Sequence, residues 1–148
     1  MIPSSRARVP VHTAEQVNER IRRNTEYTIK LYSTAGREAI DRRLKELDEE
    51  WDVERMIEAN ASAISIVGLT LGATVSRKWF VLPAIVAGFL FQHALQGWCP
   101  PIPVLRRLGF RTSQEIDYER YALKAIRGDF TAIDQSTSAD RALSIMEQ

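Results

Sequence analysis

The fold of this chain is decided by two uncharged runs: residues 59–76, ANASAISIVGLTLGATVS, and residues 79–98, WFVLPAIVAGFLFQHALQGW. Only Arg77 and Lys78 separate them. A bilayer core about 30 Å thick needs about 20 helical residues, and about 17 still suffice. Both runs meet that length and neither has a charged face for water, so we expect a two-helix transmembrane hairpin over residues 59–98. The alternative is a soluble helical hairpin whose apolar faces form a core.

The averages over the whole chain resemble those of a soluble protein, because the charges lie almost entirely outside the two runs. The chain has 148 residues, 26% charged side chains and a formal net charge of +1, with a mean hydropathy of −0.23. A near-neutral chain lacks the basic excess typical of nucleic-acid binding, so we expect no nucleic-acid partner. The first residues are polar and lack the apolar segment of a cleaved signal peptide. The hairpin itself is therefore expected to direct membrane insertion.

Polar, helix-forming sequence flanks the hairpin on both sides. The predicted fold class is therefore all-α: an integral membrane protein in which amphipathic cytoplasmic helices flank a two-helix transmembrane hairpin. Gly36 lowers helix stability within the N-terminal flank, so a break is expected beside it. The predicted segments, in chain order, are a flexible lead-in at 1–12, an amphipathic helical arm at 13–58 with a break near 33–36, the hairpin at 59–98, a Pro-rich stop with an interfacial segment and a short helix at 99–127, and a polar tail at 128–148 in which Ser138 could start a last helix.

The N-terminal arm carries acid–base pairs four residues apart, in the order that favours a helix. These pairs are Glu19/Arg23, Glu26/Lys30, Glu38/Arg42 and Asp41/Lys45. The apolar stripe of the arm is thin, so the arm is expected to contact another protein more readily than to form a large core alone.

Small residues recur every four positions in both runs, at Gly68, Gly72 and Ser76 in the first and at Ala84 and Gly88 in the second. This spacing lets two helix backbones approach closely, and in lipid such packing drives helix association. We expect these faces to hold the two helices of the hairpin together. A homodimer contact through them is the alternative.

The first run is only moderately apolar. Its polar residues are Asn60, Ser62, Ser65, Thr70, Thr74 and Ser76. This composition fits a helix packed against protein better than one surrounded by lipid. The expected partners are therefore the lipid bilayer and a larger integral membrane complex.

The basic residues near the ends of the hairpin predict its orientation. They are Arg42, Arg43, Lys45 and Arg55 before the first run, Arg77 and Lys78 between the runs, and Arg106, Arg107 and Arg111 after the second. Cytoplasmic flanks carry the excess of Lys and Arg, so both termini are expected in the cytoplasm. Aromatic and basic side chains gather at membrane boundaries, and the expected interface anchors are Arg77, Lys78, Trp79, Trp98, Arg106 and Arg107.

Three short motifs surround the two runs: WDVERM at 51–56, GWCP at 97–100 and LGFRT at 108–112. Together they resemble the YgaP-type transmembrane domain family, over about residues 51–112. This resemblance implies a two-helix module of the bacterial inner membrane with cytoplasmic termini. Some family members carry a rhodanese sulfurtransferase domain, and none is expected in this chain. Pro101–Pro103 and the long N-terminal arm also depart from the family pattern, so the resemblance implies a membrane module and carries over no activity.

Cys99, the single cysteine, is the strongest candidate for chemistry. A nucleophilic thiolate needs a pKa lowered by a cation, a metal or a helix N-terminus, but Cys99 follows a helix C-terminus. Its functional interpretation is a thiol that relays persulfide sulfur near the membrane surface. The simpler interpretation is a small side chain in the turn that ends the second run.

His93 is the only ionisable residue inside either run. Ionisable residues within a membrane are candidates for function by default, and a neutral imidazole could be an axial ligand of haem iron or chlorophyll magnesium. The simpler interpretation is a histidine bonded to a polar residue of the neighbouring helix. No cofactor is predicted.

The sequence favours no enzyme. The carboxylates between Asp48 and Glu54 have no accompanying His, Cys or Gly-rich loop, so they indicate a solvated face. We expect a non-catalytic accessory or assembly subunit that packs its hairpin against a larger integral membrane complex and contacts that complex with its cytoplasmic arms. The alternatives are a sulfur relay through Cys99 and a tetrapyrrole-binding subunit that uses His93.

Overall fold

The computed structural model describes residues 7–131. This part of the chain is helical and contains no strand, which confirms the all-α fold class. The elements are α1 (Arg8–Val11), α2 (Glu15–Ser33), α3 (Arg37–Glu49), α4 (Val53–Thr74), the 3-10 helix η1 (Arg77–Phe80), α5 (Val81–Gln96), α6 (Ile102–Leu108) and α7 (Ser113–Arg127). Most of the predicted tail, including the helix expected from Ser138, lies outside the described residues.

The chain divides into two compact units. Unit 1 holds residues 7–22 and 51–114 of the described chain, and unit 2 holds residues 23–50 and 115–131. The first part of α2 therefore belongs to unit 1 and the rest of this helix belongs to unit 2.

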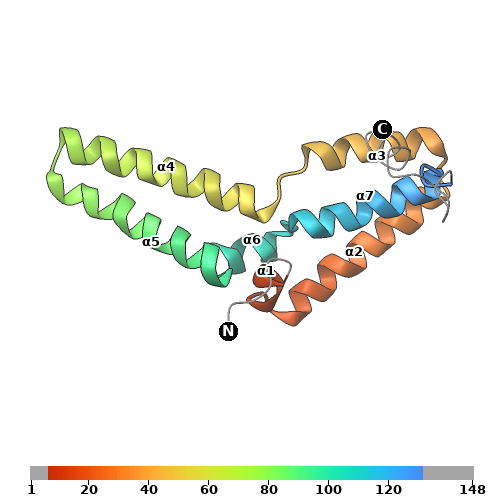
Figure 1. Cartoon of the computed structure of the whole chain (residues 1–148), viewed down its shortest axis with the longest axis horizontal. Helices are drawn as coiled ribbons and strands as arrows, with labels where there is room; N and C mark the ends of the chain where they lie inside the picture. Colours follow the sequence, from red (N-terminus) through yellow and green to blue (C-terminus); the bar gives the residue numbers. More distant parts are fainter. Residues whose placement is uncertain (1–6, 132–148) are drawn as a thin grey trace, which may run out of the picture. The chain divides into compact units, whose positions relative to one another are not determined.

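The hairpin of unit 1 consists of α4, η1 and α5, with α4 and α5 side by side (Figure 1). Asp52 caps α4, because its carboxylate accepts a hydrogen bond from the backbone N–H of Arg55 at 2.7 Å. A helix of 22 residues is about 33 Å long, and α4 has that number. Pro83 lies in the first turn of α5, where its missing N–H leaves no hydrogen bond unmade. Gly97 ends α5 in the left-handed region, at φ 77°.

Unit 1 has a small apolar core at the base of the hairpin. Val9 of α1 is almost fully buried in it. Residues 1–12 were predicted to be a flexible lead-in, but Arg8–Val11 form a helix because Val9 removes its side chain from water in this cluster. The buried members of this core are Val9, Val53, Ile57, Cys99, Ile102 and Leu105.

Unit 2 contains α3, α7 and the part of α2 after Arg22. Its core is formed by Ile40, Leu44, Leu47, Ile116 and Leu123, with Tyr32 of α2 packed against it. The chain leaves the helical conformation between Ser33 and Arg37, where Gly36 adopts φ 88°. A positive backbone φ is unfavourable for residues other than glycine. Glycine therefore suits position 36 in the turn that precedes α3.

The helical arm predicted at 13–58 has an additional interruption. α3 ends at Glu49 and α4 begins at Val53, with Glu50 in an extended conformation. The helix that enters the hairpin thus begins six residues before the uncharged run does. Asp is a favoured N-cap residue. Asp52 is therefore the feature of the sequence from which the interruption between α3 and α4 could have been predicted.

Candidate functional site

The two helices of the hairpin approach most closely at Gly68 and Gly72 of α4. A Cβ atom at Gly68 would lie 2.6 Å from Cδ of Pro83, and one at Gly72 would lie 2.7 Å from two ring carbons of Phe80. Both distances are shorter than van der Waals contact. These two glycines therefore let α5 and η1 pack directly on the backbone of α4.

The other small residues lie elsewhere. Ala84, Gly88 and Ser76 are exposed, and nothing lies within 4 Å of a Cβ placed on Gly88. The structure thus brings Gly68 and Gly72 into the hairpin contact and leaves the Ala84/Gly88 pair on the outer surface of α5.

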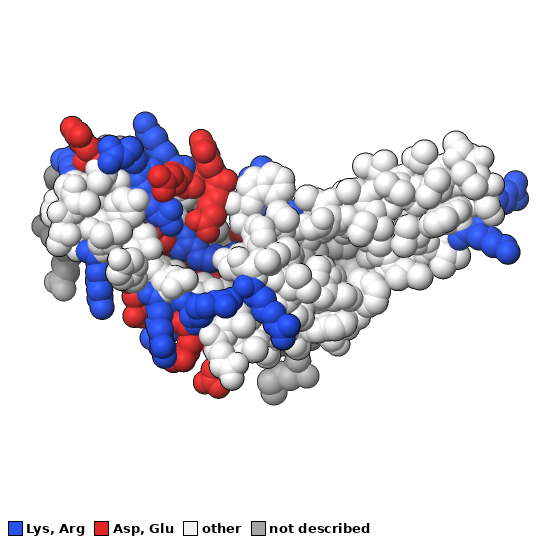
Figure 2. Space-filling view, turned by 180° about the vertical axis from the view of Figure 1, so that it is seen from behind, with Lys and Arg blue, Asp and Glu red and all other residues white. Residues whose placement is uncertain are grey.

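The outer surface of the hairpin is apolar and largely uncovered. Arg37–Thr74 and Arg77–Gln96 each contain a stretch long and apolar enough to cross a membrane, and only 22% and 6% of these stretches are buried. The face in Figure 2 shows no charged side chain along the hairpin until its turn, where basic residues appear. The exposed large apolar side chains of α4 and α5 include Ile64, Ile66, Val67, Leu69, Val81, Ile85, Phe89, Phe91 and Leu95.

Several polar side chains on α4 form hydrogen bonds with the backbone of their own helix. Thr70 donates to the carbonyl of Ile66 at 2.8 Å, and Thr74 donates to the carbonyl of Thr70 at 2.7 Å. Asn60 donates in the same way to Met56 at 2.8 Å. These side chains therefore form hydrogen bonds without a neighbouring protein. The polar composition of residues 59–76 is thus weaker support for a protein partner than the sequence alone suggested.

The predicted interface anchors fall into two groups. Arg77, Lys78 and Trp79 are exposed in η1, and Trp98 is half-buried with its ring 6.4 Å from that of Phe89. The two arginines of α6, Arg106 and Arg107, differ in burial.

Arg106 is fully buried in unit 1, while Arg107 is exposed. The guanidinium of Arg106 donates to Oδ1 of Asn18 at 2.9 Å and to the carbonyl of Phe110 at 3.1 Å. A buried cation needs hydrogen-bond partners to offset its lost hydration, and this one joins α2 to the end of α6. The prediction that Arg106 anchors the membrane surface is therefore wrong, because its side chain is enclosed by protein.

Cys99 is buried in the apolar core of unit 1. Burial raises the pKa of its thiol above the ordinary value. A raised pKa reduces the thiolate fraction at neutral pH, and the thiolate is the nucleophile. The surroundings of Cys99 thus fit a packed side chain better than a reactive one.

His93 is buried near the end of α5, and its Nδ1 has no hydrogen-bond partner among residues 7–131. The adjacent turn is closed by α1: a Cβ atom on Gly97 would lie 2.4–2.6 Å from Arg8, including its backbone. An axial ligand must present a ring nitrogen to an open, ring-sized space. The His93 side chain is only 8% exposed, so the described residues leave little open space beside its ring.

Two polar contacts attach α1 to the base of the hairpin. The guanidinium of Arg8 donates to Oε1 of Glu54, from Nε at 3.2 Å and also from Nη2. Nε2 of His12 donates to the carbonyl of Gln96 at 3.0 Å. The first turn of α4 and the end of α5 are thus both joined to α1, which closes the base of the hairpin.

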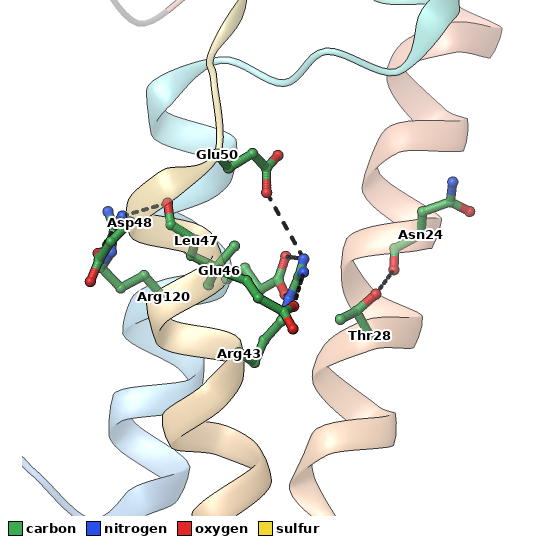
Figure 3. Close-up of polar contacts among 9 residues, drawn as sticks. Asn24, Thr28, Arg43, Glu46, Leu47, Asp48, Glu50 and Arg120 are labelled. Atoms are coloured by element: carbon green, nitrogen blue, oxygen red, sulfur yellow. Dashed lines mark hydrogen bonds and ion pairs between the residues drawn. The ribbon is translucent and has the colours of Figure 1, made fainter.

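In unit 2, Arg43 of α3 lies at the centre of a carboxylate cluster (Figure 3). It contacts the fully buried Glu119 of α7 at 2.7 Å, Glu46 at 3.0 Å and Glu50 at 4.0 Å. Figure 3 shows Arg120 and Asp48 on the other side of α3. The two polar clusters therefore use different faces of the same helix.

That other side of α3 borders a cleft of about 400 Å³ between α3 and α7. Its lining residues are Arg37, Asp41, Leu44, Lys45, Asp48, Arg120, Lys124 and Arg127. Arg127 contacts Asp41 at 2.6 Å and Arg120 contacts Asp48 at 3.1 Å, so both carboxylates in the lining are paired across the helices. No local sequence pattern indicated this site, because its residues come from two segments more than 70 positions apart.

Within residues 7–131, no group of three or more His, Cys, Asp or Glu side chains is placed to hold a metal ion. Comparisons with protein-family models, with curated proteins and with solved structures gave no match for this chain.

Proposed function

We propose that this protein is a non-catalytic accessory subunit anchored in a membrane by its hairpin. In this proposal α4 and α5 cross the bilayer, both termini are cytoplasmic, and the hairpin packs against a larger integral membrane complex. The observation that carries the proposal is the apolar outer surface of the hairpin, which the described part of the chain leaves largely uncovered.

The dimensions of the hairpin support a bilayer as its environment. The 16 residues of α5 extend for about 24 Å and the four residues of η1 for about 8 Å. Together they match a hydrocarbon core of about 30 Å. In a soluble protein, helices of this composition would be buried in a core, whereas Val67 and Ile85 on the two helices are 53% and 51% exposed.

The ends of the hairpin support the orientation. Its turn carries only two basic residues, whereas more lie near its base, and cytoplasmic flanks carry the excess of Lys and Arg. The resemblance to the YgaP-type family supports the bacterial inner membrane as the location, with the termini inside.

The accessory role is supported by two surfaces. The Ala84/Gly88 pair on the outer face of α5 offers a smooth site for a helix of another membrane protein. Unit 2 adds a charge-rich helical surface attached to the same chain. A homodimer through the Ala84/Gly88 face is the alternative use of the first surface.

The two other candidate functions receive less support. A persulfide relay needs an accessible thiolate, but Cys99 is buried and its pKa is raised. A tetrapyrrole ligand needs open space beside an imidazole nitrogen, but the His93 side chain is only 8% exposed.

The proposal is tested by isolating the tagged chain from bacterial membranes. We expect the protein to remain in the membrane fraction after alkaline carbonate washing, which removes peripheral proteins. In mild detergent it should co-purify with stoichiometric integral membrane proteins that mass spectrometry identifies. A protein released by carbonate would contradict the anchor, and a monomer or homodimer without other subunits would contradict the accessory role.

A further inference from the structure

The cleft between α3 and α7 has an excess of positive charge. Five of its lining residues are Arg or Lys and two are Asp. This excess is local, because the described part of unit 2 carries nine Lys and Arg against eleven Asp and Glu. The basic side chains have therefore gathered on one side of an otherwise slightly acidic unit.

The charges in the cleft are unevenly paired. Arg120 contacts both Asp48 and Asp117, and Arg127 contacts both Asp41 and Asp129, so four carboxylates surround these two arginines. The three other cations are different: Arg37, Lys45 and Lys124 have no hydrogen bond or ion pair among residues 7–131. Three unpaired positive charges are thus left around one cleft.

The unpaired cations also act on a neighbouring carboxylate. The pKa of Asp129 lies below its ordinary value, chiefly because of the hydrogen bond from Arg127, and the charges of Lys124 and Arg37 lower it further. The positive potential of the cleft therefore reaches a group that does not line it.

The positions of the cations follow from the helix geometry. Asp41 pairs with Arg127 and Asp48 with Arg120, so α3 and α7 run antiparallel. Lys45 lies one turn after Asp41 on α3, and Lys124 lies about one turn before Arg127 on α7. Lys45 and Lys124 thus lie between the two cross-helix ion pairs, with one pair on each side. Arg37 lies one turn before Asp41.

From this arrangement we propose that the cleft binds an anion that carries a phosphate or pyrophosphate group. Ammonium and guanidinium groups are the usual protein ligands of phosphate oxygens, and an anion with three negative charges would neutralise the three unpaired cations. The volume of about 400 Å³ lies in the range of small-molecule sites. The phosphate group could belong to a soluble compound or to the headgroup of an anionic lipid. Binding of a soluble compound does not depend on the proposed membrane anchor.

The test measures how fast an amine-reactive reagent modifies individual lysines of the full chain, with mass spectrometry as the readout. The protein is held in nanodiscs of phosphatidylcholine, without and with inorganic pyrophosphate, and in nanodiscs that contain phosphatidic acid. Lys45 and Lys124 line the cleft, and Lys30 of α2 is the internal control because it lies outside it. Protection of both cleft lysines by at least fivefold, with Lys30 changed less than twofold, is the expected result. Protection by pyrophosphate identifies a soluble phosphate ligand, and protection by phosphatidic acid alone identifies a lipid headgroup.

A pair of variants separates specific binding from general electrostatics. Lys45→Gln with Lys124→Gln removes two charges from the cleft, and Lys30→Gln with Arg42→Gln removes two charges from exposed positions outside it. Calorimetric titration with pyrophosphate in detergent should give a dissociation constant at least tenfold weaker for the first pair and changed less than twofold for the second. Equal weakening of both, or no protection of Lys45 and Lys124 by either phosphate source, would overturn the proposal. Matching circular dichroism spectra would show that both pairs of variants are folded.

Discussion

Gly68 of α4 and Pro83 of α5 lie in direct contact across the hairpin: a Cβ atom on Gly68 would be 2.6 Å from Cδ of Pro83. The ring of Pro83 is rigid and the adjacent Cβ of Leu82 would lie at 3.3 Å, so the neighbours have little freedom to move away. The separation of the two helices therefore depends on the missing side chain of Gly68.

We accordingly expect Gly68→Val to open the hairpin and to lower its stability by about 1–3 kcal/mol, the usual cost of overpacking. Titration with sodium dodecyl sulfate, followed by circular dichroism, measures this loss. Gly88→Val is the matched control, because nothing lies within 4 Å of a Cβ there, and its stability should be unchanged or higher. Equal losses for the two variants would show that the glycine contact does not hold the hairpin.

A charge on the outer surface of the hairpin distinguishes lipid from water as its environment. Val67 is exposed on α4, so Val67→Arg would be nearly neutral in a soluble protein. In a bilayer, an Arg at the centre of a helix costs about 2.5–3.5 kcal/mol. We therefore expect the variant to lose at least half of its yield in the membrane fraction, measured by immunoblotting. The control Ala125→Arg, at an exposed position of α7, should retain its yield, and a Val67→Arg variant that behaves like this control would contradict a membrane-spanning hairpin.

The buried guanidinium of Arg106 should be important for unit 1. Arg106→Met keeps much of the side-chain volume but leaves Asn18 and the Phe110 carbonyl without their donor. An unsatisfied buried polar group costs about 1–3 kcal/mol, and the same detergent titration should detect this loss. Arg107→Met changes the neighbouring exposed side chain and should have little effect. A neutral Arg106→Met would mean that the hydrogen bonds of Arg106 add no net stability.

The thiol of Cys99 should react slowly and at higher pH than an exposed thiol. Burial raises its pKa, so its thiolate fraction at any pH near neutrality is smaller. We expect its alkylation rate to be at least tenfold below that of the thiol introduced by Ser33→Cys in a Cys99→Ser background, since residue 33 is exposed. Rates measured from pH 6 to pH 10 should also reach their half-maximum at a higher pH for Cys99. A faster reaction for Cys99 would instead restore the sulfur-relay hypothesis.

The sequence was most informative where one residue property repeats along the chain. The absence of charge over 59–76 and 79–98 predicted the two long apolar helices, and the stop after Trp98 matches Gly97 in the left-handed region. Both features depend only on local sequence. The spacing of Gly68 and Gly72 likewise pointed to a close helix contact, although the same spacing at Ala84 and Gly88 lies on an outer surface.

The sequence failed where a position is decided by residues far along the chain. Spacing predicted that Asp41 would pair with Lys45, but Asp41 contacts Arg127 of α7 and Lys45 has no ion pair among residues 7–131. Arg106 looked like a surface anchor, yet Asn18 gives it a partner inside unit 1. Val9 looked like part of a flexible segment, because nothing near it reveals the apolar cluster that it joins. No local pattern specifies such contacts.

The proposal that the hairpin crosses the bilayer, with both termini in the cytoplasm and the turn on the other side of the membrane, is tested most directly by site-directed labelling. Single cysteines at the turn (Ser76→Cys) and at the end of α2 (Ser33→Cys), each in a Cys99→Ser background, are exposed to a membrane-impermeant maleimide in intact spheroplasts and in inverted membrane vesicles. The account predicts that the thiol at position 76 is labelled in spheroplasts and protected in inverted vesicles, and that the thiol at position 33 shows the reverse pattern. Labelling of both positions from the same side of the membrane would contradict a transmembrane hairpin.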